Sequence, residues 1–307
     1  MGDTSFLVFG AGAWGTALSL QLNKSGNKVY LSSFDSTNLS SIASTRINQK
    51  YLPGVSLPDE IEVIGLNQEL FKKIDCVVIC VKSPYFSKAL SVLNNHSASF
   101  KVLWATKGFD LESGALLSEI VSKHYGKGIE HGVLSGPTFA EELSIGKPAA
   151  ITLATNTIKD PSELASSMSN ESLRVYISTD PIGVQLGGSL KNIIAIASGI
   201  SDAMNMGANA RAALITRGAE EMRALGKVLG ANEATFSGLS GIGDLVLTST
   251  DDQSRNRQLG IHIGSGGSLA SFKEAKNGAP EGVHAVRALV DTGMVSDDQF
   301  PIMTRVY

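Results

Sequence analysis

The stretch SFLVFGAGAWGTALSLQL, residues 5–22, decides the fold of the first half of this chain. An apolar run leads into Gly10, Gly12 and Gly15, which have the spacing G-x-G-x-x-G, and a helix-like run follows. Between a strand and a helix, such glycines allow a tight turn, close approach of the backbone to a pyrophosphate and close packing of helix on strand. The helix N-terminus adds unpaired N–H groups and partial positive charge for the anion. The stretch therefore predicts a dinucleotide-binding turn.

Similar apolar runs, separated by stretches of helical length, continue as far as residue 179. Strands that are apolar on both faces and separated by helices are typical of a parallel sheet covered by helices. The strands predicted in this way are Ser5–Gly10, Lys28–Ser33, Ile74–Val81, Lys101–Thr106, Gly132–Gly136, Ala149–Thr155 and Arg174–Thr179, with a helix at Ala13–Ser25.

The pattern changes near Pro181, where strand-like runs stop and apolar residues begin to recur at helical spacing. We therefore expect an α/β N-terminal domain with a Rossmann-like parallel sheet, residues 1–185. An all-α C-terminal domain, residues 186–307, follows it. The last residues, FPIMTRVY, look like the start of a helix, which predicts that the C-terminus is truncated. Apolar faces on such helices permit a homodimer without requiring one.

Composition and charge exclude several classes of protein. Charged residues make up 18% of the 307, and the formal net charge is -3, which excludes a polybasic nucleic-acid arm. Cys76 and Cys80 share one predicted strand, where positions four apart are separated by about 13 Å, too far for a disulfide. We expect reduced cysteines and a cytoplasmic location. The five histidines show no metal-ligand spacing, so we expect no metal site.

The N-terminal run has no charged residue between Ser5 and Leu22 and is long enough to raise the question of a membrane span. Three glycines interrupt the run, and no Lys or Arg precedes it, so the basic segment of a signal peptide is missing. We therefore expect neither a signal peptide nor a membrane span.

The end of the second predicted strand bears on the choice of cofactor. A site selective for NAD usually places an acidic residue there, to bind the ribose 2′-hydroxyl. Here the strand ends with Ser32 and Ser33, which are small and neutral and can accept a 2′-phosphate, and Asp35 comes late. The pattern favours NADP, with NAD tolerated.

Two segments at predicted strand ends are candidates for ligand contact, because carboxyl ends of parallel strands face the ligand crevice. Lys107, in the string ATKG, is placed to meet an anion, and Thr138, in SGPT, to donate its hydroxyl. Thr138 and Glu141 also fit a helix capping box, which is compatible with that role.

Lys191 is the candidate for proton transfer. It precedes an apolar helical run, IIAIASG, and a lysine near a helix N-terminus is poorly placed for the helix dipole. Burial there would lower its pKa from ~10.4 towards the ~7–8 that suits proton transfer. Asn192 lies beside it. The alternative is a surface lysine whose apolar stem alone is buried.

A last cluster, Ser254 to Arg257 in the string SRNR, has four consecutive hydrogen-bond donors that suit a phosphate group. Asp244, in SGIGDL, is a carboxylate in an apolar turn. It can hold a substrate hydroxyl, orient Lys191 or cap a helix, and the sequence leaves these alternatives open.

These clusters, in this order, resemble the bacterial-type NAD(P)-dependent glycerol-3-phosphate dehydrogenases over nearly the whole chain. The matching strings are GAGAWGTALS, WATKG, SGPTFAEEL, GVQLGGSLKNIIAI, GANARAALITRG, GLSGIGDLVLTSTDDQSRNRQLG and PEG. The resemblance implies that Lys191 is the catalytic proton donor and acceptor. The substrate contacts that it implies are Lys107, Gly136, Thr138, Lys191, Asp244, Ser254, Arg255 and Asn256. The cofactor contacts that it implies, besides Gly10, Gly12 and Gly15, are Trp14, Phe34, Lys107, Ala140, Arg255 and Glu281.

The resemblance further implies interconversion of dihydroxyacetone phosphate and sn-glycerol 3-phosphate in the cytoplasm, feeding glycerophospholipid synthesis. Phe34 departs from the family, because many relatives carry Arg or His there towards the 2′-phosphate, and this weakens the preference for NADP. Without the resemblance, two alternatives stay open. One is another Rossmann-plus-helical reductase of 2-keto or hydroxy acids, and the other is a non-catalytic dinucleotide sensor.

Overall fold

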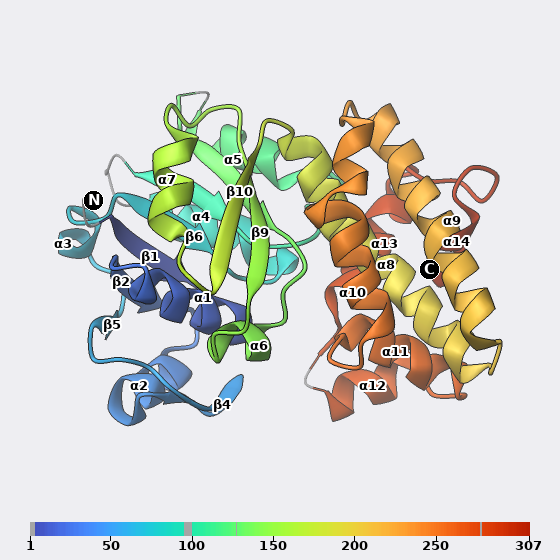
Figure 1. The fold of residues 1–307 in the computed structure, drawn as a ribbon, viewed down its shortest axis with the longest axis horizontal. Helices are drawn as coiled ribbons and strands as arrows, with labels where there is room; N and C mark the ends of the chain where they lie inside the picture. The colour runs from blue at the N-terminus through green and yellow to red at the C-terminus, as the bar shows by residue number, and fades with distance from the viewer. Residues whose placement is uncertain (1–3, 95–99, 127, 277) are drawn as a thin grey trace. The chain divides into compact units, whose positions relative to one another are not determined.

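The computed structural model describes residues 4–94, 100–126, 128–276 and 278–307. The chain forms two compact units, coloured along the sequence in Figure 1. The first unit, which contains the sheet, consists of Met1–Thr106, Ile120–Leu134 and Thr138–Thr179. The second, which is helical, consists of Lys107–Glu119, Ser135–Pro137 and Asp180–Tyr307. Two short connecting segments that follow sheet strands in the sequence thus belong to the helical unit.

The sheet has eight strands in the order β10-β9-β8-β7-β6-β1-β2-β5. Parallel pairing is seen from β5 through to β8 and again between β9 and β10. The strands are β1 (Ser5–Phe9), β2 (Lys28–Ser32), β5 (Ile61–Val63), β6 (Cys76–Ile79), β7 (Lys101–Trp104), β8 (His131–Ser135), β9 (Ala149–Ala154) and β10 (Leu173–Ser178).

Every strand expected from an apolar run is present, because the central strands are buried on both faces and consist of apolar side chains. Strand β5 was not expected. It has three residues, of which Glu62 is exposed, so it leaves no apolar run in the sequence. The antiparallel pair β3 (Ile47–Asn48) and β4 (Leu52–Ser56) is also unexpected, because β3 has two residues and most of β4 is exposed.

Helices cover both faces of the sheet, with α1, α6 and α7 on one face and α4 and α5 on the other (Figure 1). The side chains between α1 and the sheet form one apolar core, in which Phe6, Val8 and Leu18 are fully buried. The helices that follow β1 to β9 are α1 (Ala13–Lys24), α2 (Ser36–Thr45), α3 (Gln68–Phe71), η1 (Ser83–Tyr85), α4 (Phe86–Asn94), α5 (Leu117–Tyr125), α6 (Ala140–Ser144) and α7 (Pro161–Met168).

The helical unit is built around α8 (Pro181–Ala203), against which α9, α10, α11 and α13 pack. The Asp180 carboxylate caps α8 by accepting the Gly183 N–H at 2.9 Å, and the helix crosses residue 185 without a break. Its middle turns are buried all round, which matches their apolar sequence. The other elements are α9 (Gly207–Val228), η2 (Glu233–Ser237), η3 (Leu239–Gly243), α10 (Asp244–Thr250), α11 (Arg255–Gly264), α12 (Leu269–Ala275), α13 (Glu281–Asp291) and α14 (Pro301–Val306).

Three further findings apply to the described residues alone. Within them, no helix combines the length and the apolarity that crossing a bilayer requires. They contain no group of three His, Cys, Asp or Glu side chains arranged to hold a metal ion; His96 lies outside them. Cys76 and Cys80 are both free thiols, and burial raises the pKa of each.

Candidate active site

The glycine-rich turn between β1 and α1 depends on glycine for two different reasons. A Cβ on Gly15 would lie 2.1 Å from the Gly10 carbonyl oxygen, and one on Gly10, where φ is 125°, would lie 2.6 Å from the Cys80 carbonyl oxygen. Both positions therefore need glycine for the fold itself. Gly12 has open space where its Cβ would be, and no side chain caps α1 there. The uncapped start of α1 is a cradle that fits a pyrophosphate.

Side chains around this turn lie within the sheet-containing unit. The ring of Phe34 packs edge-on against Phe9, with centroids 4.9 Å apart, and the Lys88 ammonium lies 5.1 Å from the Phe34 centroid. The Trp14 indole N–H donates to the Thr138 hydroxyl at 3.0 Å. Ala140 begins α6, which packs on α1.

The carboxylate of Asp35, the acidic residue that follows β2, already has hydrogen-bond and ion-pair partners within the protein. Its carboxylate accepts the Asn38 N–H at 2.9 Å, which caps α2, and pairs with Lys50 at 2.7 Å. The hydrogen bond with the Lys50 ammonium holds the pKa of Asp35 below its ordinary value. The Ser32 hydroxyl is buried and has no hydrogen-bond partner among the residues that the structure describes.

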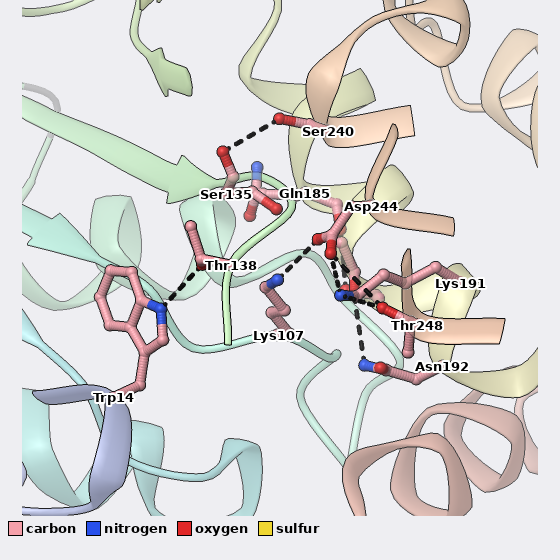
Figure 2. A network of polar contacts seen from close by, with 12 residues as sticks. Trp14, Lys107, Ser135, Thr138, Gln185, Lys191, Asn192, Ser240, Asp244 and Thr248 are labelled. Carbon is pink, nitrogen blue, oxygen red and sulfur yellow. Dashed lines mark hydrogen bonds and ion pairs between the residues drawn. The ribbon is translucent and has the colours of Figure 1, made fainter. Parts of the chain in front are cut away.

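A compact polar network lies in the helical unit, where two lysines share one carboxylate (Figure 2). The Lys191 ammonium contacts Asp244 Oδ1, and the Lys107 ammonium donates to Oδ2 of the same residue at 2.7 Å. Lys191 also donates to the Thr248 hydroxyl at 2.7 Å. The side chains of Lys191 and Asp244 are 7% and 1% exposed, whereas that of Lys107 is 23% exposed. The surface-lysine alternative therefore does not describe Lys191. The expected place of Lys191 near a helix N-terminus is wrong, because α8 already begins at Pro181 and Lys191 lies in the middle of that helix.

The environment of Lys191 brings the pKa of its ammonium close to neutral pH. Burial lowers the pKa of Lys191, the Asp244 carboxylate raises it and the nearby Lys107 ammonium lowers it again, with a net value of about 7. An amine with such a pKa can both donate and accept a proton near neutral pH.

Close packing of α8 on the segment before α10 brings these charges together. A Cβ on Gly187 would lie 2.2 Å from the Ser240 carbonyl oxygen, so glycine lets the two segments touch. Asp244 is the first residue of α10, and Thr248 lies four residues further on the same helix face. Thr248 was missed in the sequence, although its spacing from Asp244 could have revealed it.

The four polar side chains from Ser254 to Arg257, at the start of α11, have different hydrogen-bond partners. Ser254 caps the helix by accepting the Arg257 N–H at 3.2 Å, and the Arg255 guanidinium donates to the carbonyls of Lys276 and Gly278. Arg257 is turned away from this group, because its guanidinium pairs with Asp202 and Asp252.

Asn256 links α11 to the helix that carries Lys191. Its Nδ2 donates to Asn192 Oδ1 at 2.9 Å, and its Oδ1 accepts the Gly282 N–H at 2.9 Å. Glu281 is the first residue of α13, directly before that glycine. Gly136 follows β8, and the neighbouring Ser135 carbonyl accepts the Ser240 hydroxyl at 3.2 Å.

Comparison with known proteins identifies the family to which the chain belongs. The family model described as the NAD-dependent glycerol-3-phosphate dehydrogenase N-terminus matches residues 5–160, and that of the C-terminus matches residues 180–307. The chain belongs to the glycerol-3-phosphate dehydrogenase family. The family, the fold class, the enzyme class and the use of NAD or NADP expected from the sequence are thereby confirmed.

Individual members of this family match over more than nine-tenths of their length. Glycerol-3-phosphate dehydrogenase (NAD(P)+) of Thioalkalivibrio sulfidiphilus is 41% identical over 308 residues, which cover 100% of this chain and 92% of that protein. The enzyme of the same name from Wigglesworthia glossinidia brevipalpis is 39% identical, with coverage of 100% and 94%. The crystal structure of glycerol-3-phosphate dehydrogenase from Coxiella burnetii superposes with a TM-score of 0.93 at 36% identity, covering 99% of this chain and 93% of that one.

More distant structures share the fold alone. A D-mandelate dehydrogenase has a TM-score of 0.64 at 14% identity, and a ketopantoate reductase from Ralstonia eutropha has 0.62 at 16%. Among the hypotheses that the residues left open, the family match therefore favours the glycerol-3-phosphate dehydrogenase over a keto-acid reductase and over a non-catalytic sensor.

Proposed function

We propose that the chain interconverts dihydroxyacetone phosphate and sn-glycerol 3-phosphate, with Lys191 as the catalytic acid and base. The observation that carries this proposal is the buried ammonium of Lys191, held on Asp244 with a pKa of about 7. A charged lysine is costly to bury unless it is paired. A reaction that needs a proton donor with a pKa near 7 explains why a lysine stands at this position of an apolar helix.

The cofactor is held mainly by the glycine-rich turn. The backbone of Gly10, Gly12 and Gly15 receives the pyrophosphate, and the start of α1 supplies N–H donors. When bound, the dinucleotide supplies the hydride that reduces the C2 carbonyl. The proposed contacts along the nucleotide are Trp14, Phe34, Lys107, Ala140, Arg255 and Glu281.

NADP is the preferred cofactor in this proposal, and NAD is tolerated. The two neutral serines at the end of β2, Ser32 and Ser33, accept a 2′-phosphate without repulsion, whereas an NAD-selective site presents a free carboxylate there. Support comes from Asp35, whose carboxylate is already engaged by Lys50 and by the first turn of α2.

Lys191 performs the proton transfer on the substrate. As negative charge develops on the C2 oxygen, the ammonium first stabilises it and then donates its proton, a step typically worth about 10²–10⁴ in rate. Asp244 and Thr248 hold the Lys191 nitrogen in place by hydrogen bonds. In glycerol 3-phosphate oxidation the neutral amine accepts the proton instead.

Polar side chains bind the rest of the substrate. Arg255 and Asn256 hold the phosphate, since a guanidinium and an amide offer several donors in fixed directions. The further contacts proposed for the substrate are Lys107, Gly136, Thr138, Asp244 and Ser254.

A spectrophotometric assay tests the proposal directly. The purified chain is mixed with NADPH or NADH and dihydroxyacetone phosphate, and the loss of reduced-nicotinamide absorbance is followed. An unphosphorylated 2-keto acid of similar size is the parallel substrate. Turnover of the phosphorylated ketone alone supports the proposal. Turnover of the keto acid in preference, or binding of the cofactor without turnover of either, contradicts it.

The wider setting is also a proposal. We place the enzyme in the cytoplasm, where its product feeds glycerophospholipid synthesis, and we allow for a homodimer. In this scheme residues 1–185 form the dinucleotide-binding domain and residues 186–307 form the helical substrate and catalytic domain. Size-exclusion chromatography with light scattering tests the oligomeric state.

A further inference from the structure

A buried serine ties the helix that carries Lys191 to the segment that carries Lys107. Ser189 lies on α8, two residues before Lys191, and is 1% exposed. Its hydroxyl oxygen accepts the N–H of Gly108 at 2.8 Å, across 81 positions of the sequence. Gly108 follows Lys107 directly, and residues 107–109 are called the Lys107 turn below. The turn and α8 belong to the same helical unit, so this contact lies within one compact body.

The Ser189 hydroxyl uses both its proton and a lone pair within the protein. The Gln185 carbonyl, one turn earlier in α8, lies 2.8 Å from the hydroxyl oxygen, whereas the Gly108 carbonyl lies 3.2 Å from it. The single proton is donated to the nearer Gln185 carbonyl, and a lone pair accepts the Gly108 N–H. Gly108 is buried, so its N–H depends on this acceptor rather than on water.

The backbone of the Lys107 turn lies closely against α8. Gly108 has a φ of 144°, a conformation that residues with a side chain rarely adopt. Phe109, which follows, is buried in the same apolar core as Leu190 of α8. A Cβ on Gly188 would lie 3.6 Å from Lys107 Cγ, so the stem of this lysine runs along α8. Ser189 is therefore the polar contact in the middle of an otherwise apolar attachment.

This attachment sets the point from which the Lys107 side chain reaches Asp244. The Lys107 ammonium donates to Asp244 Oδ2 at 2.7 Å, and Lys191 contacts the other oxygen of that carboxylate (Figure 2). The Lys107 side chain is long and 23% exposed, so burial alone does not hold it in one conformation.

We propose that Ser189 is a positioning residue for the reaction, which holds the backbone of the Lys107 turn so that the Lys107 ammonium stays on Asp244 beside Lys191. The inference rests on the proposed function of the chain. It assigns a role to a residue that lies outside the contacts proposed for the substrate and for the cofactor.

The place of the Lys107 ammonium affects the proton that Lys191 carries. Burial lowers the pKa of Lys191, the Asp244 carboxylate raises it, and the Lys107 ammonium lowers it further, because a second positive charge disfavours the protonated amine. If the Lys107 turn moves and its ammonium leaves Asp244, the pKa of Lys191 rises. Lys191 then keeps its proton up to a higher pH.

The other charged side chains of the helices packed on α8 have different surroundings. Glu221 of α9 accepts the N–H groups of Ile302 and Met303 at the start of α14. Arg257 of α11 pairs with two aspartates, and Arg255 donates to two backbone carbonyls. Glu281 and His284 of α13 are half-buried. The charged groups that shift the pKa of Lys191 are Asp244 and Lys107.

The test removes the Ser189 hydroxyl and leaves every proposed contact of substrate and cofactor in the chain. The quantity measured is the alkaline limb, the fall of kcat/KM for dihydroxyacetone phosphate reduction as pH rises. We expect Ser189→Ala to move this limb to higher pH by about 0.5–1 pH unit, because the pKa of Lys191 rises. The profile of glycerol 3-phosphate oxidation, which needs the neutral amine, moves in the same direction. A merely structural loss would lower the rate at every pH without moving the limb.

Ser198→Ala is the matched control. Ser198 lies on the same helix and is fully buried, and its hydroxyl donates to the Ser249 carbonyl at 2.8 Å. The change therefore removes a buried hydroxyl and a hydrogen bond of α8 without touching the Lys107 turn. Its alkaline limb is expected to stay at the wild-type pH. Denaturant unfolding of both variants shows whether they lose similar stability.

A double-mutant cycle shows whether Ser189 acts through Lys107. Lys107→Met removes the ammonium and keeps most of the stem, so it is expected to move the limb to higher pH at least as far as Ser189→Ala does. In the Lys107→Met background, Ser189→Ala then moves the limb no further. If Ser189→Ala does not fold, Ser189→Cys replaces it in each comparison, because a thiol is only a weak acceptor for the Gly108 N–H.

Three results would overturn the inference while leaving the proposed function intact. They are a limb that stays in place or moves to lower pH in the Ser189 variant, an equal displacement in Ser198→Ala, and additive displacements in the cycle with Lys107→Met. A wild-type chain that does not turn over dihydroxyacetone phosphate, or whose reduction profile has no alkaline limb near pH 7, would overturn the proposed function itself.

Discussion

The glycine-rich turn and the Lys191 network bind charge in opposite ways. The turn uses six consecutive residues and the main chain, and its N–H donors carry no titratable proton. The network uses side chains from three separate segments, and two of its charged groups, Lys191 and Asp244, are buried. The comparison teaches that backbone donors suit the permanent anion of a cofactor. A buried, paired amine suits a charge that appears and disappears during a reaction.

The largest expected effect comes from removing the buried amine. Lys191→Ala should lower kcat by about 10²–10⁴ because it removes the ammonium that is proposed to donate the proton. Cofactor affinity should be unchanged, since the turn lies elsewhere in the chain. Steady-state kinetics and fluorescence titration with NADPH measure the two quantities. Lys227→Ala, a change at an exposed lysine of α9, is the control. A near-normal kcat in Lys191→Ala would remove this residue from catalysis.

Arg255→Ala should give the next largest effect. Loss of a charged hydrogen bond of about 1.5–3 kcal/mol should lower kcat/KM for dihydroxyacetone phosphate by roughly 10- to 150-fold. The value for unphosphorylated dihydroxyacetone should change far less, because that substrate lacks the group which Arg255 holds. Parallel assays with both ketones make the comparison, with Arg223→Ala, at an exposed arginine of α9, as control. Equal losses on both substrates would contradict the phosphate assignment.

Two alanine substitutions in the turn should affect different properties, Gly15→Ala the stability of the fold and Gly12→Ala the affinity for the cofactor. Gly15→Ala puts a Cβ 2.1 Å from the Gly10 oxygen, so the free energy of unfolding should fall by about 2–4 kcal/mol. Gly12→Ala meets open space, so stability should stay within about 0.5 kcal/mol, while cofactor affinity falls about tenfold because the backbone approach is blocked. Denaturant unfolding and NADPH titration measure both. Tight cofactor binding by Gly12→Ala would show that the pyrophosphate does not lie over this residue.

The smallest expected effect is a shift in the pH dependence of kcat/KM, caused by Asp244→Asn. Reduction of the ketone needs protonated Lys191, so kcat/KM should fall as pH rises through its pKa of about 7, and glycerol 3-phosphate oxidation should rise over the same range. The Asp244 carboxylate raises the pKa of Lys191. Asp244→Asn should therefore move the alkaline limb of the reduction profile to lower pH. A limb that stays in place would mean that Lys191 is not the group that titrates.

Much of the fold follows from local patterns. The buried strands of the sheet are continuous apolar runs, and α8 is an apolar run of helical length that begins after Asp180 and Pro181. The exceptions are instructive. Strand β5 and the pair β3 and β4 are short and half-exposed, so sheet pairing rather than composition makes them strands.

The candidate site was predictable to a different extent in each part. Lys191 attracts notice in the sequence because a cation precedes an apolar run. The part of the argument that used the helix dipole was wrong, because α8 begins at Pro181 and Lys191 lies in its middle. The four donors from Ser254 to Arg257 look equivalent in the sequence, yet only the structure shows that Arg257 pairs with Asp202 and Asp252. Thr248 offers only its spacing of four residues from Asp244 as a signal in the sequence, and the structure shows its hydrogen bond with Lys191.

The sequence by itself determined the glycine-rich turn, the alternation of strands and helices and the change to helices near Pro181. Each of these depends on neighbours within about a dozen residues, through backbone sterics and the period of the apolar side chains. Tertiary structure alone decided that Lys107, 137 positions before Asp244, shares that carboxylate with Lys191. It also decided which hydroxyl the Trp14 indole meets. These contacts depend on burial and on distance in space, and a linear pattern of residues specifies neither.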